Sequence, residues 1–517
     1  MKDKILVWID DIPIHFGIAK FFHENNDCDM YGIFDVDDQQ KNFYESQNLL
    51  KFKKIWFFRD YLSKSDIEPD FEYLKNFERK YQINLWQLAY SEREFLHYNE
   101  LYKFSTKEIL NILQQECQFF EKILSEIKPD FLFIKTTDYL ENTLLHEISK
   151  AMGVRTLMLG STKLSSTKIM ISSNYDQVDD FLEQIDEASE PKNSIKSEKH
   201  EDQKQKSESF LKSFDEFQKK GPKVKSWKKP ARTLKIVTNI DKKNYKEFYS
   251  NYQLAKLKSS LIRLSGIART KKLYRKKFLD QNSMKKIDPN QPYVYFPLHV
   301  EPERNMLLSA PFYTNQIELI SNIAKSLPAE YVLLVKEHPL MKFKRWRKVS
   351  YYKNILALPN VGLIHPDVSI DNIFKTCSLV VTISGSSAIQ AAFYEKPTIV
   401  FSDTIYSKLP FVYRIKNIED LPKIIRKCIT EKFDYSLLQD FVSFMDKHTF
   451  EVDLFEMAAN AKNRFYFGGT LNYTHEISED QMMSFLDESA SKFELLSNEH
   501  AKKIKQWKIH NGKISIN

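Results

Sequence analysis

Short runs of apolar residues alternate with helical patterns along the first third of the chain. Uninterrupted runs of this kind are typical of strands buried on both faces of a parallel sheet. We predict strands at 4–9, 30–35, 54–58, 131–135 and 155–159, with the longest helices between them at about 105–127 and 139–151. Gly153 lies where a glycine that ends a helix is expected, just before the last strand. The alternation predicts a parallel sheet covered by helices.

The same alternation is clearest between residues 293 and 401. Strands are predicted at 293–298, 331–337, 361–365, 379–383 and 398–401. Helices are predicted at 312–326, at 369–377 and after the turn at 384–387 as far as Tyr394. The short connections are typical of a doubly wound nucleotide-binding domain. Because ligands bind such sheets at the carboxyl ends of the strands, functional side chains are expected in the loops that follow them.

Between and beyond these two regions the pattern changes. Residues 185–230 are polar, rich in lysine and without periodicity, which is typical of a flexible linker. We predict an α/β fold with two Rossmann-like, doubly wound domains that face a cleft. The predicted regions are a first Rossmann-like domain at 1–180, the flexible linker at 185–230, a basic helical segment at 231–290, a second Rossmann-like domain at 291–430, and a helical tail at 431–517 that packs back on the first domain.

Composition restricts the class of protein. Of the 517 residues, 42% are hydrophobic and 14% aromatic, which supplies sizeable cores and excludes a mostly disordered chain, a coiled coil or a small disulfide scaffold. No stretch approaches about 18 uncharged apolar residues, and the first apolar run ends at Asp10 before it resembles an export signal. The four cysteines are far apart and form no C-x-x-C pair. We therefore expect a reduced, cytoplasmic protein without a structural zinc site.

Positive charge is concentrated in one part of the chain. Residues 191–290 contain 28 basic and 10 acidic side chains, whereas the whole chain has a net charge of only +8. This excess fits a solvated linker or helix face, or attraction to an anionic membrane leaflet or a polyanionic substrate. No RNA- or DNA-binding signature accompanies it, so no nucleic-acid partner is expected, and peripheral contact with the inner face of the plasma membrane is considered for residues 223–286. The densest basic residues are Lys223, Lys225, Lys228, Lys229, Lys271, Lys272, Arg275, Lys276, Lys277, Lys285 and Lys286.

A serine-rich turn follows the predicted strand at 379–383. Its residues are Ser384, Gly385, Ser386 and Ser387, and a helix is predicted to begin there with Ser386 or Ser387 at the N-cap. The free N–H groups of a helix start and the serine hydroxyls are donors for a phosphate or carboxylate. The alternative is an ordinary crossover helix capped by serine. The turn is neither a P-loop nor a dinucleotide motif, because the chain has no G-K-[ST] there and no G-x-G-x-x-G.

Two neighbouring loops carry further candidates. Lys336 and His338 end the strand at 331–337, where the imidazole is placed to donate to a phosphate oxygen and the ammonium adds charge; the alternative is a surface turn. His299 and Glu303 follow the strand at 293–298 and are candidates for general acid–base catalysis. For this loop the alternative is a salt bridge between Glu303 and Arg304 or another neighbour.

Carboxylates also follow the first predicted strand of the chain. Asp10 and Asp11, with His15 close behind, face the same cleft if the two domains are stacked, so a carboxylate there is a candidate base for an acceptor hydroxyl. Asp11 is equally suited to a turn before Pro13. The run from Asp35 to Asp38 resembles the D-x-D metal motif of some nucleotide-sugar transferases, but a turn into a helix at 37–47 is favoured and no metal site is predicted.

The loops of the second region resemble those of the capsule polysaccharide biosynthesis (KpsC/KpsS-like) family. The segments that carry the resemblance are 293–305, 333–339 and 382–407, with a looser match at 81–95. The H-P dipeptide and the serine turn are also similar to those of transferases that use CMP-activated acidic sugars and of poly(glycerol phosphate) polymerases. The resemblance implies a GT-B arrangement of two Rossmann-like domains. It also implies that His338, Ser384, Ser386 and Ser387 bind the donor's phosphate, and Lys336, Gly385 and Gln390 are added to this predicted donor site.

These features predict a glycosyltransferase of capsule or surface polysaccharide biosynthesis. It would transfer a sugar from a nucleotide-sugar substrate, CMP-linked acidic sugars included, to a glycan or glycolipid acceptor, and the resemblance implies neither a metal nor a cofactor. The predicted catalytic residues are Asp10, Asp11, His299 and Glu303. Two alternatives remain open: a sugar-nucleotide epimerase with the same two-domain plan, and a non-catalytic protein that binds polyanions.

Overall fold

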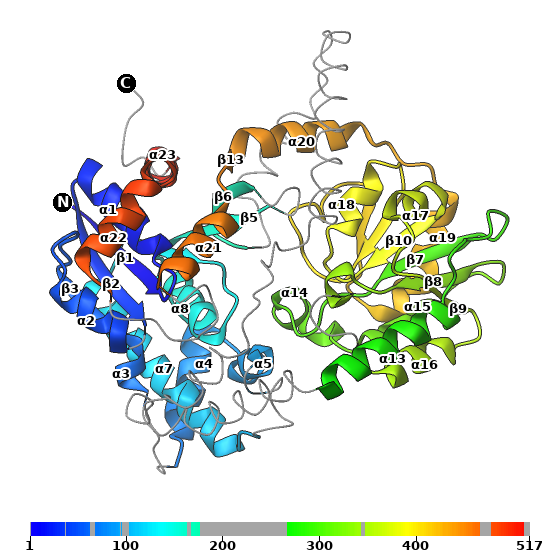
Figure 1. Ribbon diagram of the computed structural model, residues 1–517, viewed down its shortest axis with the longest axis horizontal. Coiled ribbons are helices and arrows are strands. Elements are labelled where there is room, and N and C mark those ends of the chain that lie inside the picture. The colour runs from blue at the N-terminus through cyan, green and yellow to red at the C-terminus, as the bar shows by residue number, and fades with distance from the viewer. Residues whose placement is uncertain are drawn as a thin grey trace, which may run out of the picture.

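Two sheets lie side by side in the computed structural model, and each is covered by helices on both faces (Figure 1). The residues that the structure describes are 2–36, 38–62, 68–93, 95, 103–162, 167–175, 266–342, 347–465 and 477–510. The predicted linker at 185–230 and the basic segment as far as residue 265 lie outside these ranges. We call the first sheet with its helices the first domain, and the second sheet with its helices the second domain.

The first sheet has the strand order β13–β6–β5–β4–β1–β2–β3. Strands β1 to β5 are parallel, β6 runs antiparallel to β5, and β13 runs antiparallel to β6. The apolar run of β1 is explained by burial on both faces, because Ile5 and Val7 join one core while Leu6 and Trp8 join the other. The strands are β1 (Asp3–Asp10), β2 (Cys28–Asp35), β3 (Lys54–Phe57), β4 (Phe131–Lys135), β5 (Arg155–Ser161), β6 (Lys168–Ser172) and β13 (Phe450–Glu451).

The helices of the first domain begin and end at residues that suit those positions. Ser105 and Glu108 form a capping box at the start of α7, and Gly153, with a φ of 76°, follows the end of α8. A left-handed backbone of this kind costs glycine nothing and other residues a good deal. The helices are α1 (Ile14–Asn25), α2 (Asp38–Ser46), α3 (Phe58–Tyr61), α4 (Phe71–Tyr81), α5 (Leu85–Ser91), α7 (Thr106–Ile127) and α8 (Leu140–Ala151).

The second sheet has the order β12–β11–β10–β7–β8–β9, and all its strands are parallel. Numbered along the chain within each domain, both sheets contain the order 3-2-1-4-5-6 of doubly wound nucleotide-binding folds. The strands of the second sheet are β7 (Tyr293–Pro297), β8 (Val332–Lys336), β9 (Val361–Ile364), β10 (Leu379–Thr382), β11 (Thr398–Val400) and β12 (Val412–Arg414).

Short helices connect the strands of the second domain. The helix predicted at 312–326 is split, because Asn315 accepts a hydrogen bond from the N–H of Glu318 and so starts α15 afresh. The helices are α13 (Gly266–Asn282), α14 (Arg304–Leu307), η1 (Pro311–Tyr313), α15 (Gln316–Ala324), η2 (Pro339–Lys342), α16 (Val349–Leu356), α17 (Ile370–Thr376), α18 (Ser387–Ala392), η3 (Ile418–Asp420) and α19 (Leu421–Thr430).

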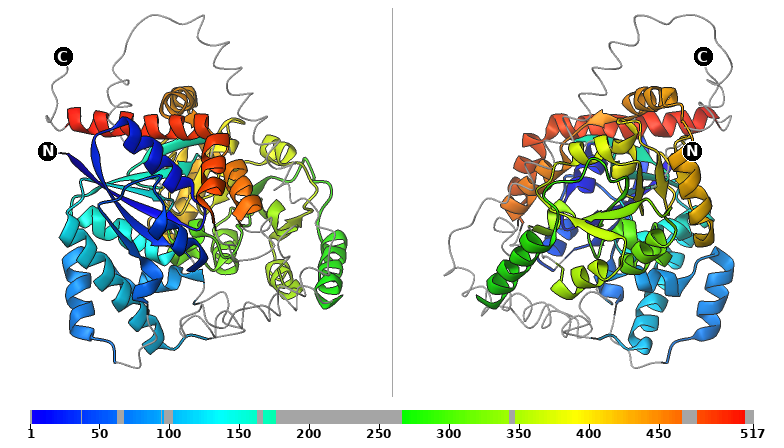
Figure 2. Two further views of the ribbon diagram at one scale, coloured as in Figure 1. Left: turned by 60° about the vertical axis from the view of Figure 1, so that its left-hand side comes forward. Right: turned by 90° about the vertical axis from the view of Figure 1, so that its right-hand side faces the viewer.

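The end of the chain returns to the first domain. After α20 (Ser436–His448), β13 joins the edge of the first sheet, and α21 (Leu454–Phe465), α22 (Glu479–Glu488) and α23 (Ala490–His510) follow. Phe493 of α23 stacks on Phe21 of α1 with ring centroids 5.6 Å apart. A Cβ atom on Gly17 would lie 2.3 Å from the Phe493 ring, so the two helices approach closely only because residue 17 is glycine. Figure 2 shows α23 running along the first domain.

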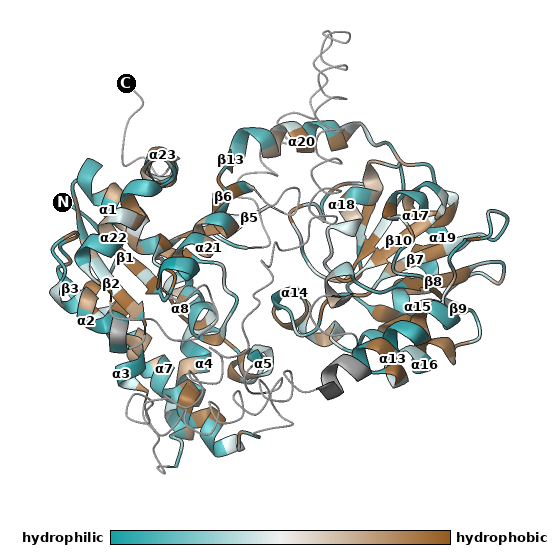
Figure 3. Cartoon of the chain, in the orientation of Figure 1, coloured by the Kyte–Doolittle hydropathy of each residue, from teal (hydrophilic) through white to brown (hydrophobic). Residues whose placement is uncertain are grey.

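The predicted α/β fold class with two doubly wound, parallel-dominated sheets is confirmed. Apolar residues are concentrated in the strands and on the inner sides of the helices (Figure 3). Strands β6, β12 and β13 were not predicted; each is short and lies at or near the edge of its sheet. Within the described ranges, none of the helices is both long and apolar enough to cross a bilayer.

Candidate functional site

Arg304 joins the carboxyl edges of the two sheets. It is the first residue of α14, the helix that follows β7, and its guanidinium donates from Nε to the carbonyl oxygen of Thr137 at 2.9 Å and from Nη2 to the Thr137 hydroxyl at 2.8 Å. Thr137 lies just after β4 of the first domain. The ring of Tyr175 lies 3.6 Å from the guanidinium carbon. The loops that follow β4 and β7 are therefore in contact, and the edges where doubly wound folds bind ligands face each other.

The serine turn occupies this edge of the second sheet, between β10 and α18. Gly385, Ser386 and Ser387 are half-buried, whereas Ser384 is fully buried and its hydroxyl donates to the carbonyl oxygen of Asn305 at 3.3 Å. Ser386 is the N-cap residue of α18, but its hydroxyl makes no capping hydrogen bond. The N–H of Gly385 donates to the Thr382 hydroxyl at 3.3 Å, so the half-buried donors of the turn are those of Ser386 and Ser387, and Ser384 fastens the turn to the loop after β7.

His299 contacts the residues just before the serine turn and packs against Gly385. Its ring is buried, and Nε2 accepts a hydrogen bond from the N–H of Ile383 at 3.1 Å and lies 3.0 Å from the Thr382 hydroxyl. A Cβ atom on Gly385 would lie 3.1 Å from this ring. Because Nε2 is occupied inside the domain, a role in proton transfer would have to use Nδ1. The structure places Glu303 directly before α14, as its N-cap residue, without a side-chain capping bond.

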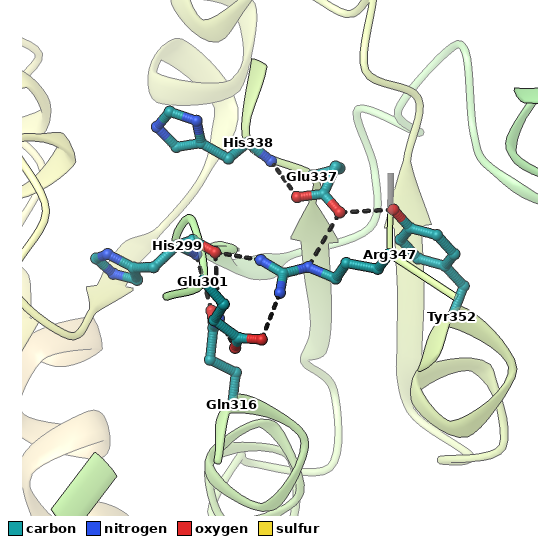
Figure 4. A network of polar contacts seen from close by, with 7 residues as sticks. All are labelled: His299, Glu301, Gln316, Glu337, His338, Arg347 and Tyr352. Atoms are coloured by element: carbon teal, nitrogen blue, oxygen red, sulfur yellow. Dashed lines mark hydrogen bonds and ion pairs between the residues drawn. The ribbon is translucent and has the colours of Figure 1, made fainter. Parts of the chain in front are cut away.

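A buried ionic network holds the loops after β7 and β8 together (Figure 4). Arg347 pairs with Glu337 at 3.1 Å and with Glu301 at 2.8 Å, and it also donates to the carbonyl oxygen of His299. Tyr352 donates to Glu337 at 2.6 Å. Burial raises the pKa of the Glu337 carboxyl, although Arg347 and the hydrogen bonds oppose this shift.

Gln316, at the start of α15, completes this network. It accepts a hydrogen bond from the N–H of His299 at 2.8 Å, and its own amide nitrogen donates to the side chain of Glu301. The charged side chains of Glu301, Glu337 and Arg347 thus all have partners within the network, and the backbones of residues 299 and 337 are held in a fixed relation.

The network positions the backbone of His338, whereas the side chain of Lys336 bonds a different loop. The backbone N–H of His338 donates to Glu337 at 2.6 Å, and the His338 and His299 rings both lie on the side of the network away from Tyr352 (Figure 4). Since β7 lies between β8 and β10, the loops of His338 and of the serine turn flank the loop of His299. Lys336 is buried and donates to the carbonyl oxygen of Val368 at 2.7 Å. Burial lowers the pKa of this ammonium to about 8.

Gln390 is buried one turn into α18, and its amide nitrogen lies 3.5 Å from the Ser386 hydroxyl. Among the predicted donor-site residues, the structure therefore brings Gly385, Ser386, Ser387 and Gln390 together around one turn. The ammonium of Lys336 lies on the carbonyl oxygen of Val368 instead, in the loop after β9.

At the facing edge of the first sheet, Asp10 and Asp11 differ in environment. Asp10 is buried and pairs with Lys135 at the end of β4, at 2.5 Å. Burial alone would raise the pKa of the Asp10 carboxyl, but Lys135 holds it below its ordinary value. Burial and the neighbouring Asp10 charge raise the pKa of Asp11. Asp11 is therefore the stronger base of the two.

The acidic run at 35–38 is explained by pairing and helix formation. Asp35 pairs with Arg59 at 2.7 Å, and Asp38 is the first residue of α2, while Asp37 lies outside the described residues. Over the part of the chain that the structure describes, no group of three or more His, Cys, Asp or Glu side chains is placed to hold a metal ion.

Sequence reasoning missed the residues that support the site. Arg347 and Lys135 lie 10 and 125 residues from the acidic partners that they neutralise, Glu337 and Asp10. A buried carboxylate needs a partner, so the sequence could have indicated that Glu337 and Asp10 each pair with a cation. It could not have shown which of the 77 Lys and Arg residues that cation is. Arg304 was considered only as a partner for Glu303.

One family model matches the part of the chain that contains this site. Residues 199–410 match the model of the family described as capsule polysaccharide biosynthesis protein. The family resemblance is confirmed. The match contains β7 to β11 and with them the loops of His299, His338 and the serine turn. No curated protein matches the chain significantly.

Several solved structures are similar to the chain at low identity. KpsC of Thermosulfurimonas dismutans, a beta Kdo 2,7 transferase, is 12% identical, with 72% of this chain and 91% of that chain covered and a TM-score of 0.33. The UDP-GlcNAc 2-epimerase of Methanocaldococcus jannaschii, in complex with UDP-GlcNAc and UDP, is 11% identical, with 86% and 100% covered and a TM-score of 0.25.

Proposed function

We propose that the protein is a glycosyltransferase of capsule or surface polysaccharide biosynthesis. The observation that carries the proposal is the contact of Arg304 with Thr137, because it brings the serine turn of the second domain and the carboxylates of the first to facing edges. The match of residues 199–410 to the capsule family supports the same reading. The proposed substrates are a nucleotide sugar, with CMP-linked acidic sugars included, and a glycan or glycolipid acceptor.

In this proposal the second domain binds the phosphate of the donor. Cleavage of the nucleotide sugar leaves negative charge on a phosphate oxygen, and the N–H groups and hydroxyls of Ser386 and Ser387 are hydrogen-bond donors that are already in place for it. His338 adds an imidazole on the neighbouring loop, where Glu337 fixes its backbone. Fixed donors stabilise developing charge without having to reorganise, which lowers the barrier to transfer.

The first domain supplies the base in this proposal. Asp11 removes the proton of the acceptor hydroxyl as that oxygen attacks the sugar, and its raised pKa makes it a better proton acceptor than Asp10. Asp10, neutralised by Lys135, holds the end of β1 in place. Contact between the domains at Arg304 keeps base and donor on facing loops and limits the entry of water.

We also propose that α13 contacts an anionic membrane, which would place the enzyme at the cytoplasmic face where a glycolipid acceptor lies. Phe278 and Leu279 fix the end of this helix to the second domain, while Leu273 and Tyr274 are 59% and 61% exposed. Apolar side chains among cations are typical of helices that lie on a membrane surface. The exposed basic residues around them are Lys271, Lys272, Lys276 and Lys277.

The test of the proposed function is donor binding. We expect calorimetry with a panel of CMP-, UDP- and GDP-sugars to find a ligand for the wild type. The double variant Ser386→Ala/Ser387→Ala and the variant His338→Ala should each bind that ligand at least about tenfold more weakly, because each loses hydrogen bonds to a charged group. His23→Ala, at the opposite end of the first sheet, is the control and should bind as the wild type does.

Three results would separate this proposal from its alternatives. Unchanged affinity in both donor-site variants refutes it. Turnover of a nucleotide sugar without any acceptor points to an epimerase. Binding of polyanions that weakens with salt, with no response to any nucleotide sugar, points to a non-catalytic protein.

A further inference from the structure

Two buried polar atoms beside the serine turn have no hydrogen-bond partner. They are the hydroxyl oxygen of Thr404, a residue only 5% exposed, and the side-chain oxygen of Asn305. Leaving a buried polar atom unpaired costs roughly 1–3 kcal/mol, so a group that bonds it is stabilised. Other unpaired buried atoms of the described residues, such as Nε2 of His15 and of His500, lie in the first domain, away from this turn. Neither Thr404 nor Asn305 was singled out by the sequence.

These two residues lie on either side of the serine turn. Strand β10 lies between β11 and β7, so the turn after β10 has the loop of Thr404 on one side and that of Asn305 on the other. The Ser384 hydroxyl donates to the carbonyl oxygen of Asn305 at 3.3 Å. On the other side, the Tyr406 hydroxyl donates to the carbonyl oxygen of Gly385 at 2.5 Å. All three loops are thus fastened together at one edge.

The backbone around Thr404 is held by hydrogen bonds, so the lack of a partner for its hydroxyl does not come from a loosely held loop. The N–H of Thr404 donates to the Ser407 hydroxyl at 3.2 Å, and that hydroxyl donates back to the carbonyl oxygen of Thr404 at 2.8 Å. Thr398, in the strand β11 that precedes the loop of Thr404, behaves differently, since its fully buried hydroxyl donates to the carbonyl oxygen of Ala388 at 3.3 Å. The fold therefore gives the hydroxyl of Thr398 a hydrogen-bond partner and leaves the hydroxyl of Thr404 without one.

We propose that Thr404 and Asn305 bind the sugar of the donor, and so take part in choosing it. A carboxamide oxygen accepts hydrogen bonds but repels an ionised phosphate oxygen, so the partner of Asn305 is a hydroxyl or an N–H group. A threonine hydroxyl both donates and accepts. Sugar hydroxyls supply these partners directly beside the turn proposed for the phosphate. This inference rests on the proposed function, because it adds to the same donor site.

The test compares each nucleotide sugar that the wild type binds with the corresponding free nucleotide. We expect Thr404→Val, which keeps the shape but removes the hydroxyl, to bind the nucleotide sugar about tenfold more weakly and the free nucleotide as the wild type does. Without ligand this variant should unfold at the same or a higher temperature, because a buried unpaired hydroxyl is replaced by a methyl group. Asn305→Leu should show the same selective loss.

Thr398→Val is the matched control. It removes a hydroxyl that has a partner, so it should lower the unfolding temperature and leave both affinities unchanged. The inference is overturned if Thr404→Val and Asn305→Leu bind the nucleotide sugar as the wild type does, or weaken the free nucleotide equally. A wild type that binds no nucleotide sugar at all overturns the proposed function itself, which is a separate result.

Discussion

At the scale of single residues, burial decides the charge of two histidines in the first domain. His15 follows β1, and His500 lies on α23, where its Nδ1 bonds the carbonyl oxygen of Leu496 at 2.7 Å. Burial lowers the pKa of His15 to about 4 and that of His500 to about 3. In both rings Nε2 is buried without a partner. Both side chains are therefore neutral in the folded protein at neutral pH, one on α1 and one on α23, the helix that covers it.

These shifts predict that the fold weakens in mild acid. An unfolded histidine takes up a proton below about pH 6.5, whereas folded His500 does so only near pH 3, so protons favour the unfolded chain across this window. The free energy of unfolding should fall between pH 7 and pH 5, and His500→Gln should reduce that fall by about 2 kcal/mol. Urea denaturation at the two pH values measures this difference.

The control for this prediction is His448→Gln. His448 also bonds the carbonyl oxygen four residues earlier, that of Phe444, at 2.8 Å, but it is half-buried. Its replacement should leave the difference between the two pH values as in the wild type. Equal differences for wild type and His500→Gln would contradict the assignment.

The residue scale also limits what the sequence could predict about the site. The serine turn and His338 were predicted because strand, turn and helix are adjacent in the sequence and carry recognisable chemistry. Lys336 was predicted for the same reason, yet its ammonium is bound by the carbonyl oxygen of Val368, which follows another strand. Arg347 and Lys135 act on partners in other loops, and such pairings depend on how loops meet in space. Local pattern contains no information about that.

At the scale of elements, strands buried on both faces were the most predictable. The strands predicted at 131–135, 379–383 and 398–401 match β4, β10 and β11 to within a residue. Edge strands such as β12 and β13 have two or three residues and no continuous apolar run, so periodicity does not reveal them. The start of α15 was missed because Asn315, a cap residue, lies inside an otherwise helical pattern.

Among the elements, α13 yields a separate prediction. Replacing Lys271, Lys272, Lys276 and Lys277 by glutamine should reduce sedimentation with vesicles that contain anionic phosphatidylserine by tenfold or more, because each cation near such a surface contributes about 1 kcal/mol. Donor affinity should not change. The control is a variant with the same loss of charge at other exposed lysines, namely Lys51, Lys53, Lys502 and Lys505. Sedimentation that is the same for both variants would remove the membrane proposal.

At the scale of the whole molecule, polar and apolar contacts hold the two domains together, since Leu308 packs against a core of the first domain and Met170 of β6 joins an apolar cluster of the second. Arg304 is the most connected of these side chains, since it bonds Thr137, also bonds the hydroxyl of Ser309 at 3.1 Å, and packs on Tyr175. A second contact is the ion pair of Lys168 in β6 with Asp446 in α20. Arg304 is buried, and Lys168 is partly exposed, so the first contact contributes more.

Arg304→Ala should therefore loosen the two domains without removing the donor site. We expect a larger radius of gyration in small-angle scattering and a sugar-transfer rate reduced by tenfold or more, with donor affinity within about threefold of the wild type, because the serine turn belongs to the second domain alone. Arg464→Ala, which breaks contacts between α21 and α22 only, serves as control. A variant that transfers sugar at the normal rate would show that this contact is not needed for the reaction.

The return of the chain to its first domain affects how the protein is made. The ring that fills the space above Gly17 is at position 493, so the apolar side of α1 receives its cover only after the second domain has been synthesised. During synthesis, Phe21 and its neighbours on α1 therefore stay exposed to other nascent chains until α23 has been made. The second domain is fully synthesised before that point. The first domain therefore completes its core later in synthesis than the second domain does.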